Sequence, residues 1–410
     1  MSARARHASP ARTGRPLHSP WGHVVQVAAA LAAGMGVGRF VYTPILPLMH
    51  AQAGLSASAG ASLATANYVG YLLGALVGIL TPALVRSPAV LRASLVVLTA
   101  TLAAMPATHA TTAWAGLRLL AGVASALIFV IAVNSLLGHL REHPAHLPGW
   151  AFGGVGAGIA LSGALILVLR GIAGWQAAWW VAAALCALLG VVSWTLRPEE
   201  TPAPGPSEAA TRPGTRTHRW FGALFVSYTL EGVGYIVAGT FLVAAIGQSA
   251  PGWAGSGAWV LVGLAAVPSS ALWAWLGRRW SRPGLLLAAL VIQAAGIALP
   301  ALAGGVTSAL VSAVLFGATF IGVSTLALAA GAHLRFPRSV ALLTTGYSAG
   351  QILGPLVVAP LLRHGYHQAL ILASVVVLAA AVAAAVLGVG FPHHVVAGPM
   401  PWRRPGRALG

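Results

Sequence analysis

Charged residues are scarce in this sequence. Only 7% of the 410 residues carry a charge, and the chain contains neither lysine nor aspartate, whereas ordinary soluble domains carry roughly 25% charged residues. Apolar residues make up 58% of the chain. This composition excludes a typical soluble domain and indicates a protein that crosses the membrane many times.

Several chemistries lack the residues that they need. The single cysteine, Cys186, lies in an apolar run, so it forms no intrachain disulfide and indicates no metal cluster. Without aspartate there is no Ser-His-Asp triad, and no Walker sequence for ATP is present. The glycine-rich stretch at residues 154–158 lacks the spacing and downstream acid of a dinucleotide-binding loop. We therefore expect no enzyme, no cofactor and no metal site.

Long apolar runs fill most of the chain. A helix needs about 20 mostly apolar residues to cross a bilayer. Helices satisfy their own backbone hydrogen bonds, and the runs are too long and too uniform for the strands of a barrel. The first run continues to Met49 and eleven more follow, so we expect no cleaved signal peptide. The twelve predicted spans are 24–49, 59–84, 89–107, 113–137, 149–169, 176–196, 220–246, 257–277, 284–303, 307–331, 341–362 and 369–391.

The 23 arginines are unevenly distributed. Most fall in the two tails and in the connections that follow even-numbered spans, whereas only Arg170 and Arg363 fall on the opposite side. Positive residues concentrate on the cytoplasmic side, so both termini are predicted in the cytoplasm. This distribution also explains the net charge of +18 without nucleic acid. The arginine-only, alanine-rich and glycine-rich usage suggests a bacterial chain, and hence an inner-membrane location.

The chain divides into two similar halves. Residues 36–41 in span one match residues 232–237 in span seven at an offset of 196, and two other pairs of segments repeat at nearly the same offset. A polar, proline-rich stretch between spans six and seven is typical of a linker. We therefore predict a tail at 1–22, a six-helix bundle at 23–196, a cytoplasmic linker at 197–219, a second bundle at 220–391 and a tail at 392–410.

Two sets of motifs resemble a known family. Span four reads GLRLLAGVASALIFV, in which Arg118, Gly122 and Ala126 follow four-residue steps, as in helix four of the major facilitator superfamily. The segments GVGRFVYTPILPLM and YTLEGVGYIVAGTFLVAAI resemble the YbfB/YjiJ branch of that superfamily. The superfamily's acidic loop residue after span two is replaced here by Pro82. The resemblance implies an all-α fold, with twelve transmembrane helices in two pseudo-symmetric six-helix bundles, and a generic transport activity.

Three charged residues, Arg39, Arg118 and Glu231, lie within the predicted spans. A charge at a helix centre costs roughly 2.5–3.5 kcal/mol on insertion scales, so such residues normally face a polar cavity or a partner. The resemblance places their spans, one, four and seven, around a central cavity. Glu231 aligns with Met35, which precedes Arg39 by about 6 Å along the helix. An ion pair between Arg39 and Glu231 is therefore feasible in at least one conformation.

These charges have alternative interpretations. Arg39 and Glu231 either neutralise each other and tie span one to span seven, or Glu231 exchanges Arg39 for a proton during transport. Arg118 either contacts the substrate or hydrogen-bonds backbone carbonyls. Two arginines against one glutamate leave a positive excess, which an organic anion would complement. Residues that share helical faces with these charges, or that pair at four-residue spacing, are predicted to support the site: Tyr42, Tyr235, Tyr347, Gln351 and Asn67, the last paired with Tyr71.

The sequence thus predicts a secondary transporter of a small organic solute, with an organic anion as the favoured substrate and protons as the coupling ion. Broad efflux of drugs or metabolites is the alternative within this class, and a non-transporting receptor or scaffold is the rival from another class. The expected partners are the solute, protons and the lipid bilayer, with the chain acting as a monomer. Pro44 and Pro47 are expected to kink or loosen the outer end of span one.

Overall fold

The computed structural model describes residues 20–139, 147–197, 215–250, 252–336 and 338–392. Within these ranges the regular elements are helices, and twelve helical segments are long and apolar enough to cross a membrane. They confirm the twelve predicted spans and the all-α fold. The predicted tails and linker lie mostly outside the described residues, although the last five residues of the predicted linker belong to the helix that begins at Thr215.

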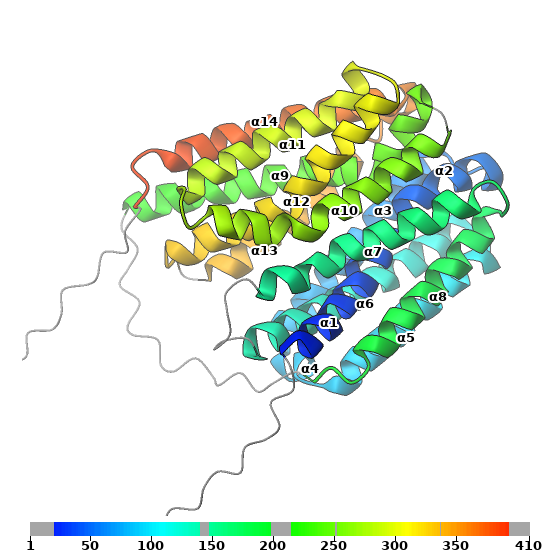
Figure 1. The fold of residues 1–410 in the computed structure, drawn as a ribbon, viewed down its shortest axis with the longest axis horizontal. Coiled ribbons are helices and arrows are strands. Elements are labelled where there is room, and N and C mark those ends of the chain that lie inside the picture. The colour runs from blue at the N-terminus through cyan, green and yellow to red at the C-terminus, as the bar shows by residue number, and fades with distance from the viewer. Residues whose placement is uncertain (1–19, 140–146, 198–214, 251, 337, 393–410) are drawn as a thin grey trace, which may run out of the picture.

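The first six spans form one bundle (Figure 1). Span one is divided into two α-helices by a π-helical segment, and a short helix follows span two. The elements are α1 (Pro20–Leu31), η1 (Ala32–Val37), α2 (Tyr42–Ala53), α3 (Ala57–Leu80), α4 (Pro82–Val85), α5 (Pro88–Ala104), η2 (Met105–Ala107), α6 (Thr111–His139), α7 (Leu147–Leu169) and α8 (Trp175–Ser193).

The last six spans form the second bundle, whose helices α9, α11, α12 and α14 lie above α1, α5, α6 and α8 in Figure 1. Helices α7, α3 and α2 of the first bundle contact α10, α13 and α9 of the second, respectively. The elements are α9 (Thr215–Ser249), α10 (Gly252–Leu276), α11 (Arg282–Leu302), α12 (Val306–His333), α13 (Ser339–Val358), η3 (Leu361–His364) and α14 (Tyr366–Gly388).

Glycines bring α7 and α10 into backbone contact. A Cβ built on Gly263 would lie 2.2 Å from the backbone nitrogen of Ala160, and one on Gly156 would lie 2.6 Å from the carbonyl oxygen of Gly263. Small residues permit such approach between membrane helices, whose association depends on packing because lipid is as apolar as the side chains. The two bundles therefore meet along a tight seam, which we define by Gly156, Ala160 and Gly263.

Span one is interrupted near its middle. The π-helix ends at Val37, and residues 38–41 form turns before α2 begins at Tyr42. Pro44 lies four residues after Phe40, and a proline ring clashes with the carbonyl group four residues before it. The break thus lies one turn upstream of Pro44, next to Arg39. The expected loosening of the outer end is not seen, because Pro47 lies inside the continuous helix α2.

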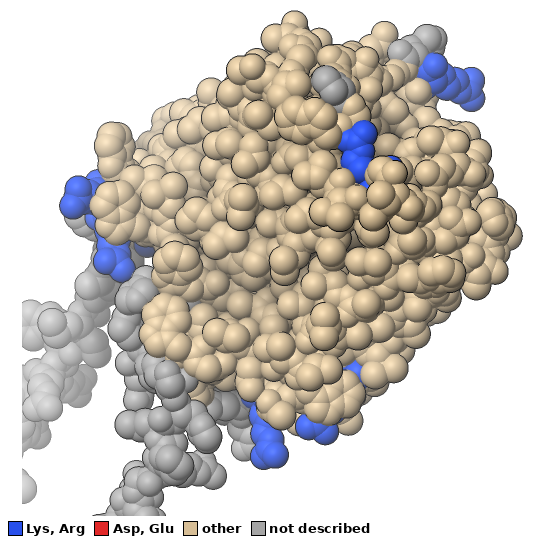
Figure 2. Space-filling view, turned by 45° about the vertical axis from the view of Figure 1, so that its right-hand side comes forward, with Lys and Arg blue, Asp and Glu red and all other residues tan. Residues whose placement is uncertain are grey.

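The surface has the character expected for contact with lipid. Large apolar side chains such as Leu80, Leu188 and Val191 are exposed on the outer faces of the helices. In Figure 2 the visible surface is almost entirely tan, and the blue arginines lie mostly near its margins. Extensive exposed apolar surface is uncommon on soluble monomers, so this surface agrees with a chain that spans the bilayer.

Replacing Gly122 by alanine should destabilise the first bundle. A Cβ there would lie 2.1 Å from the carbonyl oxygen of Asn67, so α3 and α6 would have to separate, at an overpacking cost of roughly 1–3 kcal/mol. Gly116 on the same helix has open space around such an atom, which makes Gly116→Ala the matched control. We expect thermal unfolding in detergent to occur at a lower temperature for Gly122→Ala only. Equal midpoints would contradict the close approach of α3 and α6.

Candidate functional site

Arg118 supports the interrupted part of span one. Its side chain on α6 is buried, and its two terminal nitrogens donate to the carbonyl oxygens of Gly38 and Arg39, at 3.1 and 3.2 Å. Carbonyl groups at a helix break lack their usual partners, and in lipid each unsatisfied group would be costly. The guanidinium also lies 5.0 Å from the centre of the Tyr42 ring. This geometry corresponds to the backbone-binding interpretation of Arg118.

Two of the predicted supporting residues also bind backbone. The amide nitrogen of Asn67 on α3 donates to the carbonyl oxygen of Arg118 at 2.9 Å. The hydroxyl of Tyr42 donates to the carbonyl oxygen of Gly60 at 2.9 Å. Both side chains are almost fully buried. Asn67 therefore joins α3 to α6, and Tyr42 joins α2 to α3, on the two sides of the helix break.

Arg39 extends from the turn between η1 and α2 toward the second bundle. Its side chain is only 3% exposed, and a terminal nitrogen donates to the side-chain oxygen of Gln351 on α13. The guanidinium carbon lies 4.3 Å from the ring centre of Tyr71, 5.0 Å from that of Tyr68 and 5.5 Å from that of Phe40. These are cation–π distances. The Nε atom of Arg39 is buried without a hydrogen-bond partner.

Glu231 is fully buried on α9 and is the one carboxylate among the described residues. Its Oε1 atom accepts a hydrogen bond of 3.2 Å from the side-chain nitrogen of Gln293 on α11, while Oε2 is buried without a partner. The feasible ion pair between Arg39 and Glu231 is not formed in this conformation. Each charged group instead contacts the neutral amide of a glutamine.

The axial positions of these two residues follow from a contact between the bundles. The hydroxyl of Thr43 on α2 donates to the carbonyl oxygen of Gly239 on α9, and these positions differ by the repeat offset of 196. Equivalent residues of spans one and seven therefore meet. The same offset brings Arg39 level with Tyr235, so Glu231 lies about 6 Å away along the helix axis. An extended arginine side chain can cover that distance.

Aromatic rings of the second bundle form a continuous stack. Tyr228 stacks on Tyr347 with ring centres 4.3 Å apart, and Tyr347 stacks on Tyr235 at 5.4 Å. Tyr235 is nearly parallel to Phe320 at 6.1 Å, and Phe320 to Phe316 at 5.5 Å. The stack thus joins α9, α13 and α12. Two predicted residues, Tyr235 and Tyr347, lie within it.

Three residues next to the central charges were not predicted from the sequence. Tyr68 contacts Arg39, Gln293 binds Glu231, and Phe320 belongs to the aromatic stack. A polar side chain in the middle of the ninth apolar run was the available signal for Gln293. The two aromatic residues carried no signal, because rings in apolar spans are most often packing residues.

Hydrogen bonds between the bundles continue outward from Arg39. Besides the Thr43 contact, the hydroxyls of Tyr68 and Thr240 lie 2.8 Å apart. Farther out, the hydroxyl of Tyr366 at the start of α14 lies 2.5 Å from the Nε2 atom of His50 on α2. These contacts close the end of the molecule that lies opposite the start of α1 and the end of α14.

Replacing Arg118 by lysine should destabilise the protein although the charge is kept. Lysine carries a compact ammonium and lacks the planar fork that spans two carbonyl groups, and a hydrogen bond from a charged donor is worth about 1.5–3 kcal/mol. Arg363 is exposed in η3, the short helix before α14, so Arg363→Lys is the control. We expect a lower thermal unfolding midpoint for Arg118→Lys alone. A midpoint equal to that of the control would show that the two carbonyl contacts are dispensable.

Comparison with known proteins agrees with this architecture. A family model described as "Uncharacterised MFS-type transporter YbfB" matches residues 31–387. Comparison with curated proteins gives no match. Among solved structures, the crystal structure of a mutant of the nucleoside transporter NupG aligns with a TM-score of 0.67 and 14% identity, over 90% of this chain and 99% of that chain. The chain therefore belongs to the YbfB-like family of major facilitator superfamily transporters.

Proposed function

We propose that this transporter carries a small organic anion together with a proton by alternating access. The main support for this proposal is the environment of the Arg39 side chain. Its guanidinium is buried among aromatic rings, and its side-chain partner is the neutral amide of Gln351. A buried cation without a counterion is costly. A carboxylate would supply the missing charge and accept hydrogen bonds from the guanidinium.

Glu231 supplies the link to protons. With Glu231 protonated, an anion bound to Arg39 balances the charge of that arginine. After the anion and the proton have left, the ionised Glu231 can pair with Arg39 and balance it in the same way. In both states only the charge of Arg118, which is held by backbone carbonyl groups, remains. Any other combination adds a further uncompensated charge in a medium of low dielectric constant. The loaded and the empty carrier therefore change conformation most readily, which is the condition for symport.

The orientation follows from the arginine distribution. We propose that the arginine-rich end faces the cytoplasm of a bacterial cell, in the inner membrane, with both termini inside. The contacts of His50 with Tyr366 and of Thr43 with Gly239 then close the outer side. The described conformation is then closed on the outer side, so the next step is release of the solute to the cytoplasm or binding of a solute from it. The chain would act as a monomer, because each bundle contributes to the same central site.

A neutral solute is the second candidate. The glutamine amides of Gln351 and Gln293 can bind neutral polar groups, and the matched solved structure is named a nucleoside transporter. Broad efflux of drugs or metabolites is a third candidate function for a transporter of this kind. A receptor or scaffold is the rival from another class, and exchange of a labelled solute across vesicle membranes separates it from every transporter.

Replacing Glu231 by glutamine should uncouple transport from protons. The variant cannot release a proton at this position, so a pH gradient should no longer drive accumulation of an organic acid into proteoliposomes. Exchange of the same labelled acid between the two sides should persist, because Arg39 still binds it. Glu208→Gln, which removes a carboxylate outside the spans, is the control. Unchanged pH-driven accumulation in Glu231→Gln would refute the coupling role.

A reversible cross-link at the outer contact should stop transport. Thr43 already contacts the backbone of Gly239, and a Cβ at Gly239 would meet other atoms only at 3.7 Å or more. We expect Thr43→Cys with Gly239→Cys, in a Cys186→Ser background, to form a disulfide with a membrane-permeant oxidant. Uptake should fall to the level of protein-free vesicles and recover on reduction. Continued transport by the oxidised variant would mean that this contact does not open.

A further inference from the structure

The rings that surround Arg39 indicate the chemical class of the solute. We infer that the transported anion is an aromatic carboxylate, whose carboxylate binds Arg39 and whose ring lies among Tyr71, Tyr235 and Phe320. This inference rests on the proposed function and narrows it. It follows from three features of the interior: the free hydrogen-bonding capacity of Arg39, the accessible surface of the rings beside it, and the distribution of charge.

The guanidinium of Arg39 has donors to spare. One terminal nitrogen donates to Gln351, and the Nε atom is buried without a partner. A guanidinium can use two neighbouring N–H groups to hold both oxygens of a carboxylate. A bound carboxylate would therefore satisfy Nε and displace the neutral amide from its position. Gln351 is the residue that an anion has to replace.

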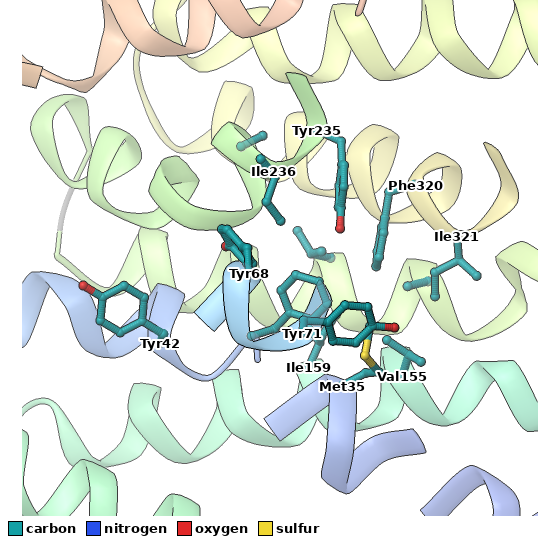
Figure 3. Packing of buried hydrophobic residues seen from close by; sticks show 14 of the residues in the cluster. Met35, Tyr42, Tyr68, Tyr71, Val155, Ile159, Tyr235, Ile236, Phe320 and Ile321 are labelled. Carbon is teal, nitrogen blue, oxygen red and sulfur yellow. The ribbon is translucent and has the colours of Figure 1, made fainter. Parts of the chain in front are cut away.

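Aromatic and apolar side chains of both bundles converge beside this guanidinium. In Figure 3, Tyr71 and Met35 of the first bundle lie opposite Tyr235 and Phe320 of the second. Tyr71, Met35 and Phe320 keep exposed fractions of 8%, 9% and 6% in the middle of their spans. Ile321, drawn beside Phe320, keeps 9%. The residual accessible surface in this region is thus provided by two aromatic rings, a thioether and an aliphatic side chain.

The rings in this surface favour a flat aromatic group over an aliphatic one. Rings gain from stacked and edge-to-face contacts beyond the area that they bury, and a thioether also contacts ring edges favourably. Tyr235 and Phe320 are parallel to within 6°, and Phe40 meets Phe320 edge-on with an interplanar angle of 71°. Because Tyr235 also stacks on Tyr347, and Phe320 on Phe316, a planar solute would gain edge-to-face contacts with these rings. A puckered ring of the same size presents no face to them.

The charges argue against neutral and cationic aromatic solutes. A neutral solute would leave Arg39 without a counterion. A cationic solute would add a second positive charge beside the guanidinium, and Glu231, the one carboxylate among the described residues, could not balance both charges. The distribution of charge therefore favours an anion.

Binding of four probes to the purified full-length protein in detergent tests the inference. Benzoate and cyclohexanecarboxylate share a carboxylate and a size but differ in the ring, benzamide keeps the ring without the charge, and uridine represents a nucleoside. We expect benzoate to bind at least about tenfold more tightly than each of the others, because it alone has both features. Affinities should be measured by isothermal titration calorimetry, with the stabilisation against heat as a second readout.

Each other outcome of this binding experiment contradicts a different part of the inference. Equal affinity for cyclohexanecarboxylate would overturn the aromatic part and leave the proposed anion transport intact. Tighter binding of benzamide or uridine would overturn the anionic part. Failure of every carboxylate to bind, and to be taken up by proteoliposomes above protein-free vesicles, would overturn the proposed function itself.

A variant of Phe320 tests the placement of the ring. Phe320→Leu keeps an apolar side chain but removes a ring face, so benzoate affinity should fall roughly two- to tenfold while that for cyclohexanecarboxylate stays unchanged. Phe221 stacks on Phe336 with ring centres 4.0 Å apart, away from Arg39, so Phe221→Leu is the control for loss of a stacked ring. Equal loss of both affinities in Phe320→Leu, or equal loss of benzoate affinity in both variants, would refute the placement.

Discussion

The contact of the Arg118 guanidinium with the carbonyl groups of Gly38 and Arg39 is the interaction on which the site depends. A helix that breaks inside a bilayer leaves polar backbone groups that water cannot satisfy. Arg118 satisfies two of them, and Asn67 in turn binds the carbonyl group of Arg118. The break that these residues stabilise lets the side chain of Arg39 leave the first bundle and reach Gln351 in the second.

The charges in the interior are sparse enough to be considered one by one. One basic side chain is committed to backbone carbonyls, and the other two charged groups, Arg39 and Glu231, each contact a glutamine. A glutamine amide offers both a donor and an acceptor, so it can hold either a cation or an anion and release it at little cost. Gln351 and Gln293 can therefore serve as temporary partners of Arg39 and Glu231 in the proposed transport cycle.

The architecture could be predicted largely from the sequence because it depends on local patterns. Apolar runs gave the twelve spans, and the repeat offset of 196 placed equivalent residues of spans one and seven at the same level, as the contact of Thr43 with Gly239 shows. Gln351 was predicted as a supporting residue, but its contact with Arg39 and the contact of Gln293 with Glu231 could not be predicted, since they depend on how spans distant in the sequence pack together. Tyr68 and Phe320 were missed because a ring in an apolar span looks the same whether it packs or binds.

The glycine seam between α7 and α10 limits how the bundles can move. At Gly263 the backbones already touch, so the helices cannot approach further there, and pulling them apart would lose the packing that joins them. In the proposed alternating access, the bundles therefore stay in contact along α7 and α10. The larger displacements then fall on contacts away from this seam, such as that of His50 with Tyr366.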